Sequence, residues 1–232
     1  MRLSILISTL GERQELFTRL VQKLTRQVKD DALEDQVEVL DFLDNREHTL
    51  GFKRNELIAR ARGEFVAFVD DDDDLSDDYI RSICNALREH PTVDCLGITG
   101  TVFFRGTHPH RFVYSLQYDH YFSRGGVYYR PPYTLNPIRR EIARQFAFEP
   151  VNFNEDIDWA MRLARAHALR SEHMIDAPIY SYFSRRRWQW QWFVDVTEPV
   201  RHPLGLQLAN RYRVARWLRT LKNPGREEFL TK

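Results

Sequence analysis

Residues 63–74 decide the fold, and they read GEFVAFVDDDDD. The apolar stretch has the length and the aromatic and β-branched content of a buried strand, and five aspartates follow it directly. Because adjacent carboxylates repel one another, an ordered loop here favours a hard divalent cation, which oxygen ligands suit. A solvated acidic loop is the alternative. Alternate residues of an extended segment share a side, so Asp70 and Asp72 can point together.

Strand and helix patterns alternate around this segment through the first hundred residues. Strand character falls on residues 3–8, 37–43 and 64–69, and helical spacing on residues 16–28, 54–61 and 79–87. We therefore expect an α/β fold, Rossmann-like, with a mainly parallel sheet flanked by helices. The loops after the three strands should then meet at the carboxyl edge of the sheet.

The remainder of the chain is less regular. Residues 100–135 are rich in aromatic residues, His and Arg, and we expect a loop-rich binding wall there in preference to a packed core. Helices near 138–146 and 156–167 and a strand near 179–183 complete the expected globule.

Composition narrows the class of protein. The chain has 232 residues, enough for one full-sized domain, and 34 Lys and Arg stand against 33 Asp and Glu. This near-neutral balance disfavours a purely electrostatic nucleic-acid binder. The charge is uneven, however, because residues 181–232 carry eleven Lys and Arg against four Asp and Glu. We expect a cation site within residues 1–180, where acidic residues are in excess, and an anionic partner for the basic residues 181–232.

Cysteine content and hydropathy address the compartment. Two cysteines are too few for a disulfide framework or a zinc site, and no apolar run approaches the ~18 residues of a membrane span. We expect a cytoplasmic protein that neither spans a membrane nor is secreted. Residues 204–222 form a basic amphipathic pattern, which fits peripheral contact with the inner membrane face or equally a docked terminal helix.

A second acidic group lies at Glu155 and Asp156, where a helix is expected to start. Carboxylates are favoured at such a position by the backbone N–H groups, so an ordinary helix cap is one interpretation. Beside an acidic metal loop, a carboxylate here is also a candidate general base.

Taken together and in order, these stretches resemble the family 2 glycosyltransferases. The resemblance spans residues 3–183 and rests on residues 3–9, 38–45, Gly51 with Arg54 and Asn55, 63–73, and 154–163. It implies a GT-A fold, a divalent cation (Mn²⁺ or Mg²⁺) and inversion at the transferred sugar. It also implies a nucleotide-sugar half at 1–100 and an acceptor half at 101–183. Residues 184–232 follow as a basic aromatic tail with a terminal helix, which the resemblance does not cover.

The resemblance implies a role for each matching side chain. Thr9 and Arg13 would border the nucleotide of a sugar donor, together with Asp71, and Lys53 or Arg54 would lie near its base or diphosphate. Asp44 would hydrogen-bond the uracil or equivalent base, with Asp41 as a neighbouring alternative. Asp70 would contact the ribose or the metal-bound diphosphate, and Asp72 would be the main metal ligand with Asp73 as its competitor. Asp156 would be the base, with Glu155 as its rival.

The chemistry of sugar transfer agrees with this set. The leaving diphosphate of a nucleoside-diphosphate sugar, such as a UDP-sugar, must be neutralised, and an acceptor hydroxyl must be deprotonated. The acceptor would be a glycan, a lipid-linked saccharide or another hydroxyl compound. Trp159, Arg187 and Trp188 are candidate acceptor contacts, because indole faces stack on sugars and guanidinium groups pair with phosphate. Simple packing of the tail is the alternative.

Two other classes of protein remain open. One is a nucleic-acid-directed protein, either a binder that uses the basic aromatic tail or a transferase that glycosylates modified DNA bases. The other is a nucleotidyltransferase that releases pyrophosphate. The absence of a glycine-rich phosphate loop after the first strand disfavours it.

Overall fold

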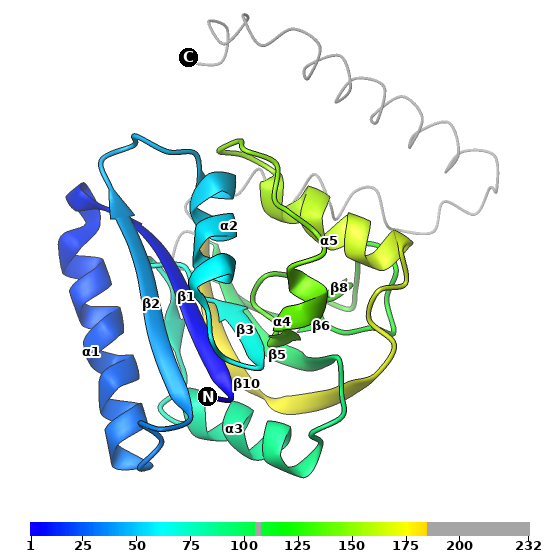
Figure 1. The fold of residues 1–232 in the computed structure, drawn as a ribbon. Coiled ribbons are helices and arrows are strands. Elements are labelled where there is room, and N and C mark those ends of the chain that lie inside the picture. Colours follow the sequence, from blue (N-terminus) through cyan, green and yellow to red (C-terminus); the bar gives the residue numbers. More distant parts are fainter. Residues whose placement is uncertain (105–107, 185–232) are drawn as a thin grey trace, which may run out of the picture.

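A computed structural model describes residues 1–104 and 108–184 of the chain (Figure 1). Its strands are β1 (Leu3–Leu10), β2 (Val37–Asp44), β3 (Phe65–Phe68), β4 (Asp74–Leu75), β5 (Cys95–Phe104), β6 (His108–Tyr114), β7 (Phe122–Arg124), β8 (Val127–Arg130), β9 (Ile138–Arg139) and β10 (Glu172–Ser184). Its helices are the 3₁₀ turn η1 (Gly11–Arg13), α1 (Gln14–Asp30), α2 (Leu50–Arg60), α3 (Tyr79–Glu89), α4 (Arg140–Ala143) and α5 (Glu155–Arg165). Among these described helices, none has the length and apolar character needed to cross a membrane.

Parallel pairing organises the half of the sheet that contains the first three strands. β1 lies between β2 and β3, with Leu3 paired to Val37 on one side and to Phe65 on the other. β9 runs antiparallel between β3 and β5, so β5 and its parallel neighbour β10 run in the same direction as β1. The expected sheet flanked by helices is confirmed, and β6 to β8 extend it as a mixed edge.

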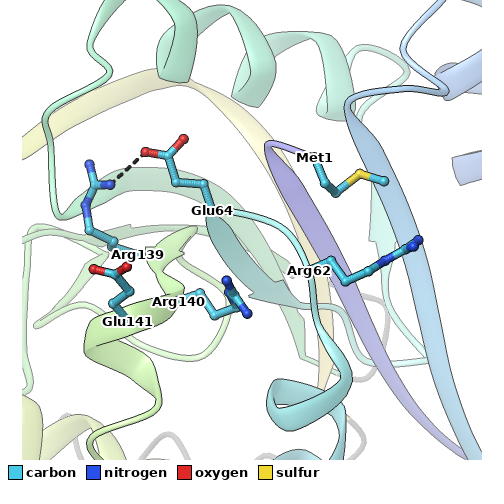
Figure 2. A pocket seen from close by; sticks show the side chains of 6 residues that line it. All are labelled: Met1, Arg62, Glu64, Arg139, Arg140 and Glu141. Atoms are coloured by element: carbon cyan, nitrogen blue, oxygen red, sulfur yellow. Dashed lines mark hydrogen bonds and ion pairs between the residues drawn. The ribbon is translucent and has the colours of Figure 1, made fainter.

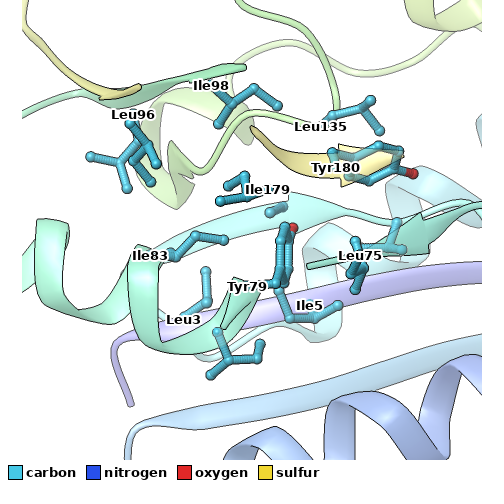
Figure 3. Close-up of a cluster of buried hydrophobic side chains, with 14 of the residues drawn as sticks. Leu3, Ile5, Leu75, Tyr79, Ile83, Leu96, Ile98, Leu135, Ile179 and Tyr180 are labelled. Carbon is cyan, nitrogen blue, oxygen red and sulfur yellow. The ribbon is translucent and has the colours of Figure 1, made fainter. Parts of the chain in front are cut away.

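Two hydrophobic cores cover the two faces of the sheet. Along β1, Leu3, Ile5 and Ile7 pack with α1 and α3, whereas Leu6 packs with α2 and α5 on the other face. This alternation follows from the two-residue period of a strand. Figure 3 shows the first core, in which the Tyr79 ring of α3 lies between residues of β1 and β10.

The prediction for residues 100–135 is wrong in one respect, because much of this region is strand and not loop. β5 and β6 pair as an antiparallel hairpin that joins the main sheet. Phe112 and Tyr114 are 0% and 1% exposed, and their rings stack with centroids 4.4 Å apart. Phe112 and Tyr114 therefore belong to the core, as do Tyr121 and Tyr133, whereas the other aromatic side chains of this region are partly buried. The interspersed His and Arg residues hid the strand period.

The expected helix at 138–146 is also shorter in the structure. Ile138 and Arg139 pair with β3 and β5 as the short strand β9, and the helix that follows has only four residues. Position in the sheet here overrides local helical spacing.

A pocket of about 220 Å³ lies at the amino ends of β1 and β3, away from the loops that follow these strands (Figure 2). Its lining residues are Met1, Arg62, Glu64, Arg139, Arg140 and Glu141. Arg139 donates to Glu64 at 2.7 Å and to two backbone carbonyls, and Arg140 donates to the carbonyl of Ala61 at 2.9 Å. These arginines hold the fold together at this edge.

Gly63 allows the connection between α2 and β3 to approach β1 closely. Its N–H donates to Ser4 Oγ at 2.8 Å, and the Ser4 hydroxyl donates to Glu38 Oε1 at 2.6 Å. A Cβ atom at position 63 would lie 2.5 Å from the Ser4 nitrogen and 2.7 Å from the Leu3 carbonyl carbon. Backbone atoms of a central strand cannot move aside without disturbing the sheet.

We expect Gly63→Ala to lower the free energy of unfolding by about 1–3 kcal/mol, the usual cost of overpacking a rigid interior. Urea unfolding at equilibrium measures this loss. An unchanged transition midpoint would mean that β1 tolerates the added methyl group.

Candidate active site

The loops that follow β1, β2 and β3 meet, as predicted. Lys53 of α2 joins the first two, since its Nζ donates to the Thr9 carbonyl oxygen at 3.0 Å and to Asp44 Oδ1 at 2.9 Å. Thr9 joins the first and third, because its hydroxyl donates to Asp71 Oδ2 at 2.7 Å. Side chains from three strand ends therefore form one connected polar group at the carboxyl edge of the sheet.

Two of the five consecutive aspartates turn into the protein. Asp71 is 2% exposed, and its carboxylate accepts hydrogen bonds from Thr9 and from Arg13 Nη1, the latter at 2.6 Å. Asp73 is 3% exposed, and its carboxylate accepts from the Tyr180 hydroxyl at 2.8 Å and from the Phe183 N–H at 2.9 Å. Both buried carboxylates are thus satisfied by donors within the protein, as burial requires.

Asp70 and Asp72 are the more open members of the same turn. The side chain of Asp70 is 41% exposed and that of Asp72 is 25% exposed. Surrounding protein withdraws water from Asp70 and raises its pKa to about 6, and Asp72 and Asp156 add to the rise, while Arg54 lowers it. The alternate pair that the strand geometry predicted is therefore the pair on the open side, and its charges repel.

This pair fits a divalent cation of the Mg²⁺ or Mn²⁺ type. Within residues 1–104 and 108–184, no three His, Cys, Asp or Glu side chains are grouped so that they could hold a metal ion. Mg²⁺ is commonly bound through one or two carboxylates and completes its coordination with water and substrate phosphates. Asp70 and Asp72 offer that number of hard oxygen ligands. Asp73, the rival ligand, faces inward.

Arg54 connects this turn to α5. The guanidinium is 3% exposed and lies over the rings of Phe68 and Phe148, at 5.1 and 5.6 Å from their centroids. Its Nη2 lies 3.4 Å from Asp70 Oδ1, and its Nε lies 3.5 Å from Glu155 Oε1. One buried cation therefore faces a carboxylate at the end of β3 and another at the start of α5.

The start of α5 separates the two candidate bases. Asn154 has a left-handed backbone with φ 63°, which Asn adopts more readily than most residues, and the helix follows directly. Successive helical residues point about 100° apart. Glu155 accordingly points inward and is 2% exposed, whereas Asp156 is only half-buried. Burial and then the charge of Asp156 raise the pKa of Tyr133 well above its usual value.

Asp44 ends β2 with its carboxylate held in place. Besides Lys53, it accepts hydrogen bonds from the backbone N–H groups of Arg46 at 3.3 Å and His48 at 2.9 Å. These donors outweigh burial and lower the pKa of Asp44, so it is ionised. Asp41 lies within β2 and is exposed, outside the group of strand-end loops.

An aromatic group beside Asp44 was missed by the sequence analysis. The His48 ring stacks on Phe52 at 4.6 Å, and Phe42 meets His48 edge-on at 5.5 Å. The Phe52 side chain is partly exposed. The sequence predicted that this helix starts at residue 54, so it did not predict that Phe52 lies in the first turn of α2.

The three predicted acceptor contacts have different outcomes. Trp159 is 1% exposed, its indole N–H donates to the Phe146 carbonyl at 2.7 Å, and its ring stacks on Phe148 at 4.9 Å. This position in the core does not fit contact with an acceptor. Arg187 and Trp188 lie outside the described residues, as do residues 204–222.

Comparison with known protein families gives a match over most of the described chain. The family model described as "Glycosyl transferase family 2" matches residues 4–148. No curated protein sequence matches the chain significantly.

Solved structures share the fold. S. aureus TarS 1–349 in complex with UDP superposes with a TM-score of 0.59 at 17% identity, over 79% of this chain and 61% of that one. The same TarS fragment in complex with UDP-GlcNAc gives a TM-score of 0.54 at 16% identity, over 80% and 59%. This chain therefore spans about three fifths of the length of the TarS fragment, and at this identity the likeness shows the fold.

Glu155→Gln tests the buried pair with Arg54 through pH. Burial raises the pKa of Glu155 from 4.5 to about 7, although Arg54 opposes the rise. The folded protein then retains a proton that the unfolded chain releases, so the stabilising contribution of Glu155 is lost as the pH rises from about 4.5 through 7.

We expect the free energy of unfolding of the wild type, minus that of Glu155→Gln, to decrease between about pH 5 and 8, as measured by urea titrations. A difference that does not change with pH would show that Glu155 ionises at its ordinary pKa.

Proposed function

The chain belongs to glycosyl transferase family 2, and from this membership we propose that it transfers a sugar from a UDP-sugar to a hydroxyl group of an acceptor. One observation carries the proposal: Asp44, the open pair Asp70 and Asp72, and the start of α5 lie around one carboxyl edge of the sheet, joined by Lys53 and Arg54. The UDP and UDP-GlcNAc complexes of TarS, which shares this fold, support UDP as the nucleotide.

On the donor side, Asp44 hydrogen-bonds the base of the nucleotide. Lys53 and two backbone N–H groups donate to its carboxylate. A carboxylate can accept about four hydrogen bonds, so it can accept one more from the base. The Phe52 ring, partly exposed beside it, supplies an apolar wall. Thr9 and Arg13 act through Asp71, which they hold below the open side of the turn.

Asp72 is the main ligand of a divalent cation, with Asp70 beside it. Bound there, Mn²⁺ or Mg²⁺ neutralises charge on the leaving diphosphate. Arg13 Nη1 lies 3.5 Å from Asp72 Oδ2 and adds positive charge on the same side. The inward-facing Asp73 orders the turn and takes no part in coordination.

Asp156 is the general base. It removes the proton from the acceptor hydroxyl as that oxygen bonds to the anomeric carbon of the donor sugar. The bond from that carbon to the diphosphate oxygen breaks on the opposite face, and UDP leaves with the electron pair. A single displacement of this kind inverts the anomeric centre. Glu155 is buried against Arg54 and serves to position α5.

The acceptor is a glycan, a lipid-linked saccharide or another hydroxyl compound. Arg187 and Trp188 follow β10 in the sequence, and β10 ends at the same edge of the sheet as the acidic turn. Contact of these two residues with the acceptor or with an anionic surface remains part of the proposal.

Asp72→Asn should abolish manganese-dependent UDP binding while the protein stays folded, because the side chain is partly exposed at a turn. Calorimetric titration with UDP, with and without Mn²⁺, measures the effect. Asp74→Asn is the matched control, since that aspartate is exposed and pairs with Lys23 at 2.9 Å. Equal losses in the two variants, or wild-type UDP binding that Mn²⁺ does not strengthen, would contradict the assignment.

Asp156→Asn should lower kcat by about 10²–10⁴-fold, the usual contribution of a general base, and leave UDP affinity near that of the wild type. Asp158→Asn on the same helix provides the control, because Asp158 pairs with Arg162 at 2.7 Å. Loss of UDP binding in Asp156→Asn, or a larger loss of kcat in Asp158→Asn, would remove Asp156 as the base.

A further inference from the structure

The Tyr180 hydroxyl joins both ends of the acidic turn. It donates to Asp73 Oδ2 at 2.8 Å and accepts from the Asp70 backbone N–H at 3.2 Å. The side chain is 2% exposed, and Figure 3 shows its ring within the hydrophobic cluster that also contains Leu75 and Ile179. The ring is therefore anchored in the core.

Strand β10 holds the turn at two further points. β4 pairs antiparallel with β10, with Leu75 opposite Tyr180, directly after the turn. The Phe183 N–H donates to Asp73 Oδ1 at 2.9 Å, so both carboxylate oxygens of Asp73 are bound from β10. Within the turn, the Asp73 N–H donates to the Asp70 carbonyl at 3.2 Å.

These contacts determine which aspartates face outward. The backbone of Asp70 and the side chain of Asp73 are both bound to the Tyr180 hydroxyl. Asp72, which lies between them, therefore has little freedom to rotate. Without the Tyr180 hydroxyl, one oxygen of the buried Asp73 side chain has no donor. This loss is costly, and it favours rotation of the Asp73 side chain toward water. Asp73 and Asp72 would then compete for the open side.

We propose that Tyr180 is a positioning residue for the cation site: its hydroxyl fixes the turn so that Asp70 and Asp72, and not Asp73, face the diphosphate of the donor. This inference rests on the proposed function. Tyr180 touches neither substrate nor cation, and it acts through the geometry of the turn.

Tyr180→Phe keeps the ring and removes only the hydroxyl. We expect the affinity for Mn²⁺ in the presence of UDP, measured by calorimetry, to fall about tenfold, which corresponds to the loss of about one hydrogen bond. Binding of UDP without metal should stay at the wild-type level, and raising the Mn²⁺ concentration should restore kcat. A general loss of folding would show neither the unchanged metal-free binding nor the rescue.

Tyr79→Phe is the matched control. Tyr79 is a buried tyrosine of the same cluster, 0% exposed, and its hydroxyl finds no hydrogen-bond partner among the described residues. Removing that hydroxyl should leave Mn²⁺ affinity unchanged and should not lower the melting temperature.

A double-mutant cycle tests whether Tyr180 acts through Asp73. If Tyr180 acts through Asp73, then Tyr180→Phe/Asp73→Asn should bind Mn²⁺ about as weakly as the worse single variant. If Tyr180 and Asp73 acted independently of each other, the two losses would add. Additive losses therefore overturn the proposal.

The remaining outcomes are also decisive. Wild-type Mn²⁺ affinity in Tyr180→Phe, together with loss of binding in Asp72→Asn, overturns the positioning role and leaves the proposed function intact. Absence of metal-dependent UDP binding in the wild type overturns both. Should Tyr180→Phe fail to fold, unchanged Mn²⁺ affinity in Asp73→Asn overturns the proposal in its place.

Discussion

Repulsion between carboxylates at one edge of the sheet is the constraint on which the rest of the structure depends. Burying an ionised carboxylate is costly unless donors satisfy it, and two like charges at close range increase the cost. The protein meets this constraint fully at Asp71, which accepts hydrogen bonds from Thr9 and Arg13. At Asp73 and Glu155, burial still raises the pKa although Tyr180 and Arg54 face these carboxyl groups. The carboxylates left on the open side are those for which a cation would relieve the repulsion.

Arg54 contacts carboxylates from both parts of the chain, before and after residue 100. Its guanidinium, held between Phe68 and Phe148, faces Asp70 from the first half and Glu155 from the second. Removing one member of such a buried group leaves uncompensated charge, so the halves cannot be separated without loss. The division of the chain near residue 100 thus describes the order of the sequence, whereas the site is built across that division.

Local patterns in the sequence predicted the strands and helices that carry the site. The features that they missed depend on pairing between segments far apart in the sequence. The apolar runs before Thr9, Asp44 and Asp70 predicted three parallel strands, because each run is short and ends in polar residues. The strands of residues 100–135 and the inward position of Trp159 depend on pairing and packing with distant segments. Tyr180 lies 107 residues from Asp73, so no spacing within the acidic run could reveal that contact.

The five aspartates are chemically identical, and only their neighbours give them different tasks. Evolutionary substitution should follow those neighbours: a change at position 71 would need a matching change at Thr9 or Arg13, and a change at position 73 one at Tyr180. Positions 71 and 73 should therefore co-vary with distant partners in an alignment. Asp70 and Asp72, which keep an open side, should vary with the ligand that the protein binds. A motif written as a string of letters would conceal this difference.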